Sequence, residues 1–318
     1  MKSPSIKVIF FTTICLLSLC GCESMVNDID QNKLPKTESK LVVECYISPQ
    51  SKRIEVLVTE SQPLFGVATY DIKAVKNAKV TLSGPSGEIT IPFIDSLSTY
   101  VLPSSEFKIE AGKTYRLVVS DPTRTVKATC TVPLQSLTLK KYTLSQVEGP
   151  PDRWDTTSHT IVAKVRFYWD DILGEKNFYG LRGYANITQN YYGFNPATGT
   201  TGMNRYEQKN TFDVRNIADS NMDGLTLNSE LMEFRLYNHT NQYKDNDGKI
   251  VQYKSETAIK EIYLEILNVD ENYYKFQQAV GHDSDDNPFI EPTLVYTNVE
   301  NGLGCFGAFN ASGSMIKP

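Results

Sequence analysis

The chain has 318 residues, of which 40% are hydrophobic and 22% are charged. This composition is typical of a globular protein and excludes a disordered, a collagen-like or a multi-pass membrane protein. The length allows two domains, and a net charge of −5 argues against nucleic acid as a partner. Three histidines leave little material for a histidine-based metal site, and the motifs HExxH, GxSxG and the P-loop are absent. We therefore expect no catalytic residues and no enzyme activity.

The amino-terminal segment has the pattern of a bacterial lipoprotein signal. Two lysines precede an apolar run over residues 8–20, which is shorter than the ~20 residues needed to span a bilayer. The run leads into Leu-Cys-Gly-Cys, the pattern of a lipobox, whose last residue is Cys22. We predict a signal peptide over residues 1–21 and a lipid anchor on the Cys22 thiol. The alternative is an ordinary secretory signal with incidental cysteines.

The residues after the predicted anchor favour an outer-membrane location. Removal of residues 1–21 takes away two lysines and no acid, so the net charge of the mature chain becomes −7. Residues 22–35 are polar and predict a tether. Glu23 stands where inner-membrane retention uses Asp, and Glu23, Asp28 and Asp30 resemble the surface-export signal of Bacteroidota lipoproteins. The sequence leaves open whether the protein faces the cell surface or the periplasm.

Residues 36–135 show the alternation that is typical of strands. In several short segments every second residue is apolar, and turn residues such as Gly84-Pro85 separate these segments. These segments lie at 41–47, 54–58, 78–82, 115–119 and 126–132. Several short strands within about 95 residues predict an immunoglobulin-like β-sandwich.

Residues 136–318 predict a second β-rich domain with one short helix. The strand candidates lie at 161–169, 179–187, 212–217, 231–237 and 259–267. The helix is expected near residues 270–280, with Asn268 as its N-cap and Glu271 as the partner in a capping box. Asn301-Gly302 predicts a β-hairpin near the carboxyl end. The predicted fold class is therefore mostly β.

Five segments of the chain resemble a known family. They are Leu41–Ile47, Ser61–Gly66, Asn77–Leu82, Gly112–Leu117 and Asn301–Ala308. Over nearly its whole mature length the chain resembles the Bacteroidota lipoprotein family known as domain of unknown function 4249. The resemblance implies an outer-membrane lipoprotein of the kind often found beside a TonB-dependent transporter. It implies no catalytic residue.

Three cysteines remain beyond the predicted anchor, so at least one is free or pairs between chains. Cys45 lies on the apolar face of the first predicted strand of the first domain, and Cys130 lies on the apolar face of the last one. Both side chains are therefore expected to point into the predicted core. A disulfide between them is one interpretation in an oxidising compartment. The other is a pair of buried free thiols that pack as small hydrophobic side chains.

The segment 188–207 is the strongest candidate for ligand binding. Its aromatic residues are interleaved with small and polar ones, and they are Tyr191, Tyr192, Phe194 and Tyr206. Such a composition predicts a flexible loop whose rings stack on sugars or dock a partner protein. The alternative is a connecting loop whose rings fold back on the sandwich.

Residues 219–230 carry the ligand spacing of a twelve-residue calcium loop. The expected ligands are Asp219, Asn221, Asp223, the carbonyl of Leu225 and the carboxylate of Glu230. Gly224 permits the sharp bend, whereas Thr226 occupies a position that is usually aliphatic. The flanking segments also predict strands rather than helices. A calcium site and a plain Asx turn without metal both remain as hypotheses, and no other cofactor is expected.

Three hypotheses about function follow. The first is a non-catalytic outer-membrane lipoprotein that assists a TonB-dependent transporter in nutrient capture. The second is a surface hydrolase that acts on glycans or peptides with carboxylates of the second domain. The third is a structural lipoprotein without a ligand.

Overall fold

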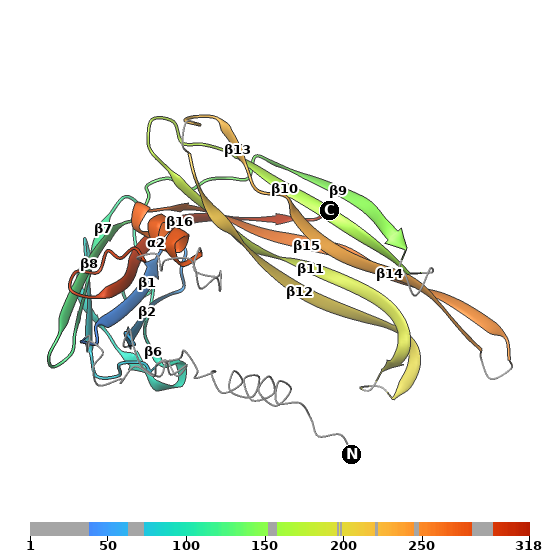
Figure 1. Cartoon of the computed structure of the whole chain (residues 1–318), viewed down its shortest axis with the longest axis horizontal. Coiled ribbons are helices and arrows are strands. Elements are labelled where there is room, and N and C mark those ends of the chain that lie inside the picture. Colours follow the sequence, from blue (N-terminus) through green and yellow to red (C-terminus); the bar gives the residue numbers. More distant parts are fainter. Residues whose placement is uncertain are drawn as a thin grey trace, which may run out of the picture. The chain divides into compact units, whose positions relative to one another are not determined.

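The computed structural model of the chain describes residues 38–62, 73–151, 158–195, 197, 199–219, 222–244, 248–281 and 295–318. The strands and the α-helix below belong to one of the two compact units into which the chain divides, residues 40–61 and 72–318. The fold is mostly β with a short α-helix, as the sequence predicts (Figure 1). Among the described residues, no helix has the length and apolar character needed to cross a membrane.

The amino-terminal half contains short strands that enclose the first core. The elements are β1 (Leu41–Ile47), β2 (Arg53–Glu60), β3 (Lys79–Gly84), β4 (Gly87–Ile91), β5 (Phe93–Ile94), η2 (Asp95–Leu97), β6 (Thr99–Pro103), β7 (Thr114–Ser120) and β8 (Thr125–Thr131). One sheet has the order β4-β3-β7-β8, and β1, β2, β6 and β5 are consecutive in the other. Alternate residues of both sheets, such as Val56 and Leu82, are buried in one cluster. This is the predicted sandwich.

The carboxyl-terminal strand β16 (Leu303–Ile316) completes that sandwich. Residues 303–308 pair in parallel with β1, whereas residues 309–316 pair antiparallel with β15 (Ile250–Val269). Phe306 and Ala308 are fully buried in the first core. The division into domains 36–135 and 136–318 stays a prediction, but the core of the first sandwich draws on residues from both sides of that division.

The predicted hairpin at Asn301-Gly302 is wrong, although the local turn chemistry is present. Asn301 has φ 61°, in the left-handed region, and the Gly302 N–H donates to the carbonyl of Val299 at 3.3 Å. The residues before the turn form an isolated bridge between Glu300 and Lys127 rather than a strand that pairs with β16. The partner of β16 at this point is β1, which lies far away in sequence.

The long strands enclose a second core. They are β9 (Lys141–Pro151), β10 (Ser158–Asp170), β11 (Phe178–Asn195), β12 (Thr200–Ala218), β13 (Thr226–Asn228) and β14 (Met232–Lys244), together with β15. β9, β13 and β14 pair with β10, and β12-β11-β15-β16 are consecutive neighbours. Phe167, Trp169, Tyr179 and Leu181 have no exposed surface in this core. The long strands run side by side in Figure 1.

The helix α2 (Glu271–Gly281) lies where the sequence predicts a helix, but its cap is different. Asp270 is the N-cap, because its Oδ1 accepts the N–H of Tyr273 at 2.8 Å. Asn268 is still part of β15, and its amide donates to the carbonyl of Gln135 at 3.0 Å. The predicted cap at Asn268 is therefore wrong. Tyr274 of the helix stacks on Phe178 with ring centroids 4.4 Å apart, which packs α2 against the start of β11.

Candidate ligand-binding surface

The predicted anchor Cys22, the signal peptide and the tether lie outside the described residues. Their prediction therefore rests on the sequence.

Most of the described residues of the aromatic segment 188–207 belong to the paired strands β11 and β12 and not to a flexible loop. Tyr191 and Tyr192 belong to β11, and Tyr206 belongs to β12 opposite Gln189. Tyr192 packs on Tyr253 with ring centroids 4.6 Å apart. The side chain of Phe194 lies outside the described residues. The segment has little apolar periodicity because both faces of the hairpin are polar, and this is why its composition resembles that of a loop.

Tyr206 is 54% exposed and lines a small cavity of about 200 Å³. Ile187, Gln189, Arg235 and Tyr237 are among its other lining residues. The cavity does not include Tyr191 or Tyr192. The structure thus does not gather the predicted aromatic residues into one site.

Three of the predicted calcium ligands form hydrogen bonds that join the connection between β12 and β13 to the connection between β10 and β11. Oδ2 of Asp219 accepts the N–H of Asn177 at 3.0 Å, and Oδ1 of Asp223 accepts the N–H of Gly174 at 2.7 Å. The carbonyl of Leu225 accepts the N–H of Asp171 at 2.9 Å. Glu230 is exposed, and Asn221 lies outside the described residues. Within the described part of the chain, no three His, Cys, Asp or Glu residues gather in a way that could hold a metal ion.

The thiols of Cys45, Cys130 and Cys305 are free and buried in the structure. Of the two interpretations of Cys45 and Cys130, the structure has the pair of buried free thiols, which lie on β1 and β8 in different sheets and share the first core. Burial raises the pKa of all three thiols, so they are poor nucleophiles.

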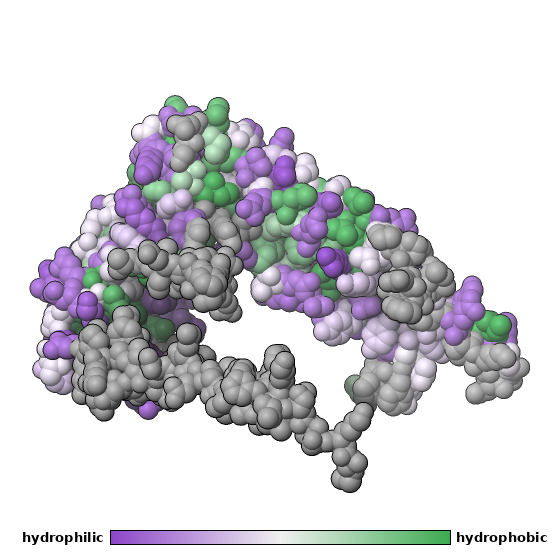
Figure 2. All heavy atoms as spheres, viewed as in Figure 1, coloured by the Kyte–Doolittle hydropathy of each residue, from purple (hydrophilic) through white to green (hydrophobic). Residues whose placement is uncertain are grey.

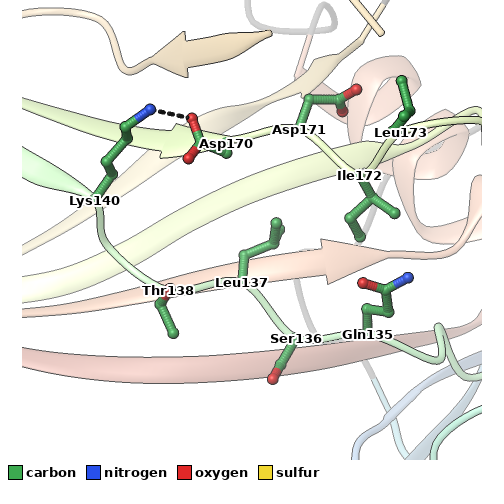
Figure 3. Close-up of a pocket in the computed structure, with 9 residues that line it drawn as sticks. All are labelled: Gln135, Ser136, Leu137, Thr138, Lys140, Asp170, Asp171, Ile172 and Leu173. Carbon is green, nitrogen blue, oxygen red and sulfur yellow. Dashed lines mark hydrogen bonds and ion pairs between the residues drawn. The ribbon is translucent and has the colours of Figure 1, made fainter. Parts of the chain in front are cut away.

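A groove of about 510 Å³ lies between the connection that leads to β9 and the end of β10 (Figure 3). Lys140 Nζ is 2.7 Å from Asp170 Oδ1, and both groups also bind the hydroxyl of Thr226. The neighbouring Asp171 points in another direction (Figure 3), where its two oxygens accept the Tyr179 hydroxyl and the Gly224 N–H. The charged groups of the groove are therefore already engaged with protein partners.

A second cavity of about 450 Å³ opens on the sheet that contains β12, β11 and β15. Leu181 and Ala185 of β11 point into the second core, so Arg182 and Tyr184, at the alternate positions, face the other way. Register places Arg182 between Asp213 and Glu265, and it places Tyr184 beside Tyr263. We call this surface the platform, defined by Arg182, Tyr184, Lys209, Asp213, Tyr263 and Glu265. Hydrophobic and hydrophilic residues lie side by side over the long strands in Figure 2.

Glu265 organises one side of the platform. Its Oε2 accepts Arg182 Nε at 2.5 Å, and its Oε1 accepts the Tyr263 hydroxyl at 2.9 Å. The Arg182 guanidinium also lies 4.8 Å from the ring centroid of Phe309. Gly313 leaves room for this arrangement, since a Cβ there would lie 2.5 Å from the Tyr263 hydroxyl oxygen. Both oxygens of Glu265 are therefore occupied.

Two tyrosine rings and a lysine form the middle of the platform. The rings of Tyr184 and Tyr263 are 5.3 Å apart between centroids and inclined by 30°. Lys209 Nζ lies 3.8 Å from the centroid of the Tyr184 ring, at cation–π distance. The arrangement offers ring faces beside a cation, which suits a ligand with both apolar and charged parts.

Asp213 differs from Glu265 in its surroundings. Asp213 is exposed and forms no hydrogen bond or ion pair among the described residues, whereas Glu265 binds Arg182. The protein around its carboxyl still removes enough water to raise the pKa of Asp213, against the opposite effect of Arg182. A cationic group of a ligand would stabilise the negative charge of this partly desolvated carboxylate.

Sequence reasoning identified strand 179–187 but not the platform. The same alternation that buries Leu181 and Ala185 turns Arg182 and Tyr184 outward, and this signal was available. Their neighbours on β12 and β15 lie 25 or more residues away in sequence. No local pattern indicates which strands pair, so the gathering of the six side chains could not be predicted.

Most of the chain matches the model of a known protein family. The model of the family described as "Domain of unknown function (DUF4249)" matches residues 25–314. The chain therefore belongs to this family, as its resemblance indicated. No curated protein matches the chain.

Proposed function

We propose that this member of the DUF4249 family is a non-catalytic, lipid-anchored protein of the outer membrane that captures a solute for a TonB-dependent transporter. The observation that carries the binding role is the platform, in which aromatic rings, a cation and a carboxylate share one open cavity. The lipobox that ends at Cys22 supports the anchor. The resemblance to Bacteroidota lipoproteins supports the transporter as partner.

The state of the carboxylates favours binding over hydrolysis. A hydrolase of the paired-carboxylate type needs two carboxyl groups that are free to exchange protons or attack. On the platform, Glu265 holds Arg182 and Tyr263 with its two oxygens, so Asp213 is the carboxylate left for a ligand. In the groove, Asp170 and Asp171 are likewise bound to protein groups.

The anchor and the partner are tested on the protein extracted from native membranes. Mass spectrometry of the amino-terminal peptide should find a diacylglycerol on Cys22, and affinity purification should recover an outer-membrane transporter. A soluble, unmodified mature chain would reject the anchor. Purification without any transporter would reject the partner.

The binding role is tested by screening glycans and peptides for a shift in melting temperature. Tyr263→Ala should abolish the shift. Tyr142→Ala removes an exposed tyrosine from β9, which pairs with β10 and not with the platform strands, and should leave the shift unchanged. Turnover of any compound would favour the hydrolase hypothesis. A blank screen would favour the structural lipoprotein without a ligand.

A further inference from the structure

We propose that the small cavity beside Tyr206 binds a single sugar unit that carries a carboxylate, such as a hexuronic acid. This cavity of about 200 Å³ is separate from the platform, so the inference goes beyond the function proposed for that surface. Four features of the cavity carry it: the place of the cavity between the strands, its single charge, its polar groups without protein partners, and its volume.

The cavity lies where strand β14 separates from β15. Residues 239–244 of β14 pair with β15, whereas residues 232–239 pair with β10. From residue 256 onward, β15 pairs with β11 instead. Thr257 still joins the two strands here, because its hydroxyl donates to the carbonyl of Tyr237 at 2.6 Å. Residues of β11, β12, β14 and β15 line the cavity, so four strands contribute to its wall.

The cavity and the platform use alternate residues of β12. Gln208 and Asn210 line the cavity, whereas Lys209 and Thr211 line the open space over the platform. Side chains alternate between the two faces of a strand, so the two sites lie on opposite faces of β12. Among the described residues, none lines both. A ligand in the cavity therefore leaves the platform free.

Arg235 supplies the charge of the cavity, and it is the only charged residue among the described ones that line it. It is exposed and forms no ion pair or hydrogen bond within the described part of the chain. Glu233, two residues earlier on β14, pairs with Lys164 at 3.3 Å instead. The guanidinium keeps its fork of N–H donors, which matches the two oxygens of a carboxylate. A phosphate carries more negative charge than one guanidinium can balance.

The other polar side chains of the cavity are neutral, and most of them lack a protein partner. Those without a hydrogen bond among the described residues are the carboxamides of Gln189, Gln208 and Asn210 and the hydroxyls of Tyr206 and Tyr237. Carboxamides and hydroxyls both donate and accept hydrogen bonds, and so do the hydroxyl groups of a sugar. Both tyrosines are about half exposed, so their ring faces can stack on a sugar ring.

Volume and chemistry together select one acidic sugar. The cavity is smaller than the ~300 Å³ at which pockets for drug-sized ligands begin, so it suits one ring rather than a chain of them. A neutral sugar would use the carboxamides and the rings but leave Arg235 without a counterion. A simple carboxylate such as acetate would pair with Arg235 but leave the carboxamides to water.

The test is a ligand-observed NMR titration of the full lipidated chain in detergent at neutral pH. The probes are glucuronate, galacturonate, glucose and acetate. Arg235→Gln removes the charge of the cavity, and Arg235→Lys keeps the charge without the planar fork. The matched control is Arg116→Gln, which removes an exposed arginine of β7 that also has no partner in the described residues. Thermal melts verify that every variant is folded.

At least one of the two uronates should bind, and glucose and acetate should bind more weakly. Arg235→Gln should weaken the uronate about tenfold, as expected for the loss of a hydrogen bond between two charged groups. It should bring the uronate to the level of glucose, and Arg235→Lys should lie between. Arg116→Gln and the platform variant Tyr263→Ala should bind the uronate like the unmodified chain.

No binding of either uronate would overturn the inference, and so would glucose or acetate that binds as tightly as the uronates. Uronate binding that Arg235→Gln leaves unchanged, or that Arg116→Gln weakens equally, would also reject the site. Uronate binding that Tyr263→Ala alone abolishes would place the sugar acid on the platform, which rejects the cavity and supports the proposed binding role. If the uronates bind as expected but no ligand depends on Tyr263, the proposed binding role of the platform fails and the cavity assignment stands.

Discussion

Asp270 provides a sharp test of the electrostatics at the junction of the two cores. Its carboxyl caps α2, and its backbone N–H donates to the carbonyl of Ala308 on β16 at 2.9 Å. Burial raises the pKa of Asp270 to about 6, against the opposing effect of the backbone N–H groups that it accepts. We predict that Asp270→Asn stabilises the protein at neutral pH, since asparagine caps helices as well as aspartate does and carries no charge.

The sign and the size follow from the two pKa values. A carboxyl that titrates near 6 in the folded protein and near 3.8 in the unfolded chain binds its proton more tightly when folded. Its contribution to stability is therefore complete below pH 4 and lost as the pH rises through 6. Each pKa unit corresponds to about 1.4 kcal/mol, so the loss is at most about 3 kcal/mol. The favourable effect of a negative charge at the helix start offsets about 0.3–1 kcal/mol of the gain from Asp270→Asn.

The assay is urea unfolding of both proteins at pH 4 and at pH 7.5. We expect Asp270→Asn to gain about 2 kcal/mol over the parent at pH 7.5 and to lose that advantage at pH 4. Asp95→Asn, whose side chain is 83% exposed, serves as the control and should show no such difference between the two pH values. A variant that is equally destabilised at both pH values would refute the reasoning, because Asp270 would then act through its cap alone.

Three further predictions follow from other parts of the molecule. Gly304→Ala should destabilise the protein by about 3 kcal/mol or more in urea unfolding, because φ is +102° and the new Cβ would lie 2.1 Å from the carbonyl oxygen of Val43; a change below 1 kcal/mol would contradict the β1–β16 register. A reducing agent should leave the melting temperature unchanged, and thiol titration in denaturant should find the three buried cysteines of the mature chain free; a lower melting temperature on reduction would indicate a bridge. Calcium at millimolar concentration should release no binding heat, because Asp219 and Asp223 already accept backbone N–H groups; saturable binding that Asp219→Ala abolishes would restore the calcium hypothesis.

The sequence alone determined the class of fold and the position of most buried strands. The side-chain period of two reports which residues face a core, so the segments 161–169 and 259–267 were recognisable as the inner parts of β10 and β15. The helix near 270–280 was also predictable, because its apolar spacing and its polar start are local features. The lipobox is local as well, and it remains a prediction from sequence.

Tertiary structure decided which strands became neighbours. The polar segment 188–207 forms strands because β11 and β12 supply each other with backbone partners, which its composition does not reveal. The turn at Asn301 has the expected left-handed residue, yet β16 pairs with β1 across more than 250 residues of sequence. The platform depends on the same long-range register, since Arg182 acquires its surroundings only when β12 and β15 pair on either side of β11. Nearly every residue offers the same backbone donor and acceptor, so the hydrogen bonds between strands do not depend on the side chains. Which strands pair is therefore decided by the burial of the whole sheet rather than by any local pattern.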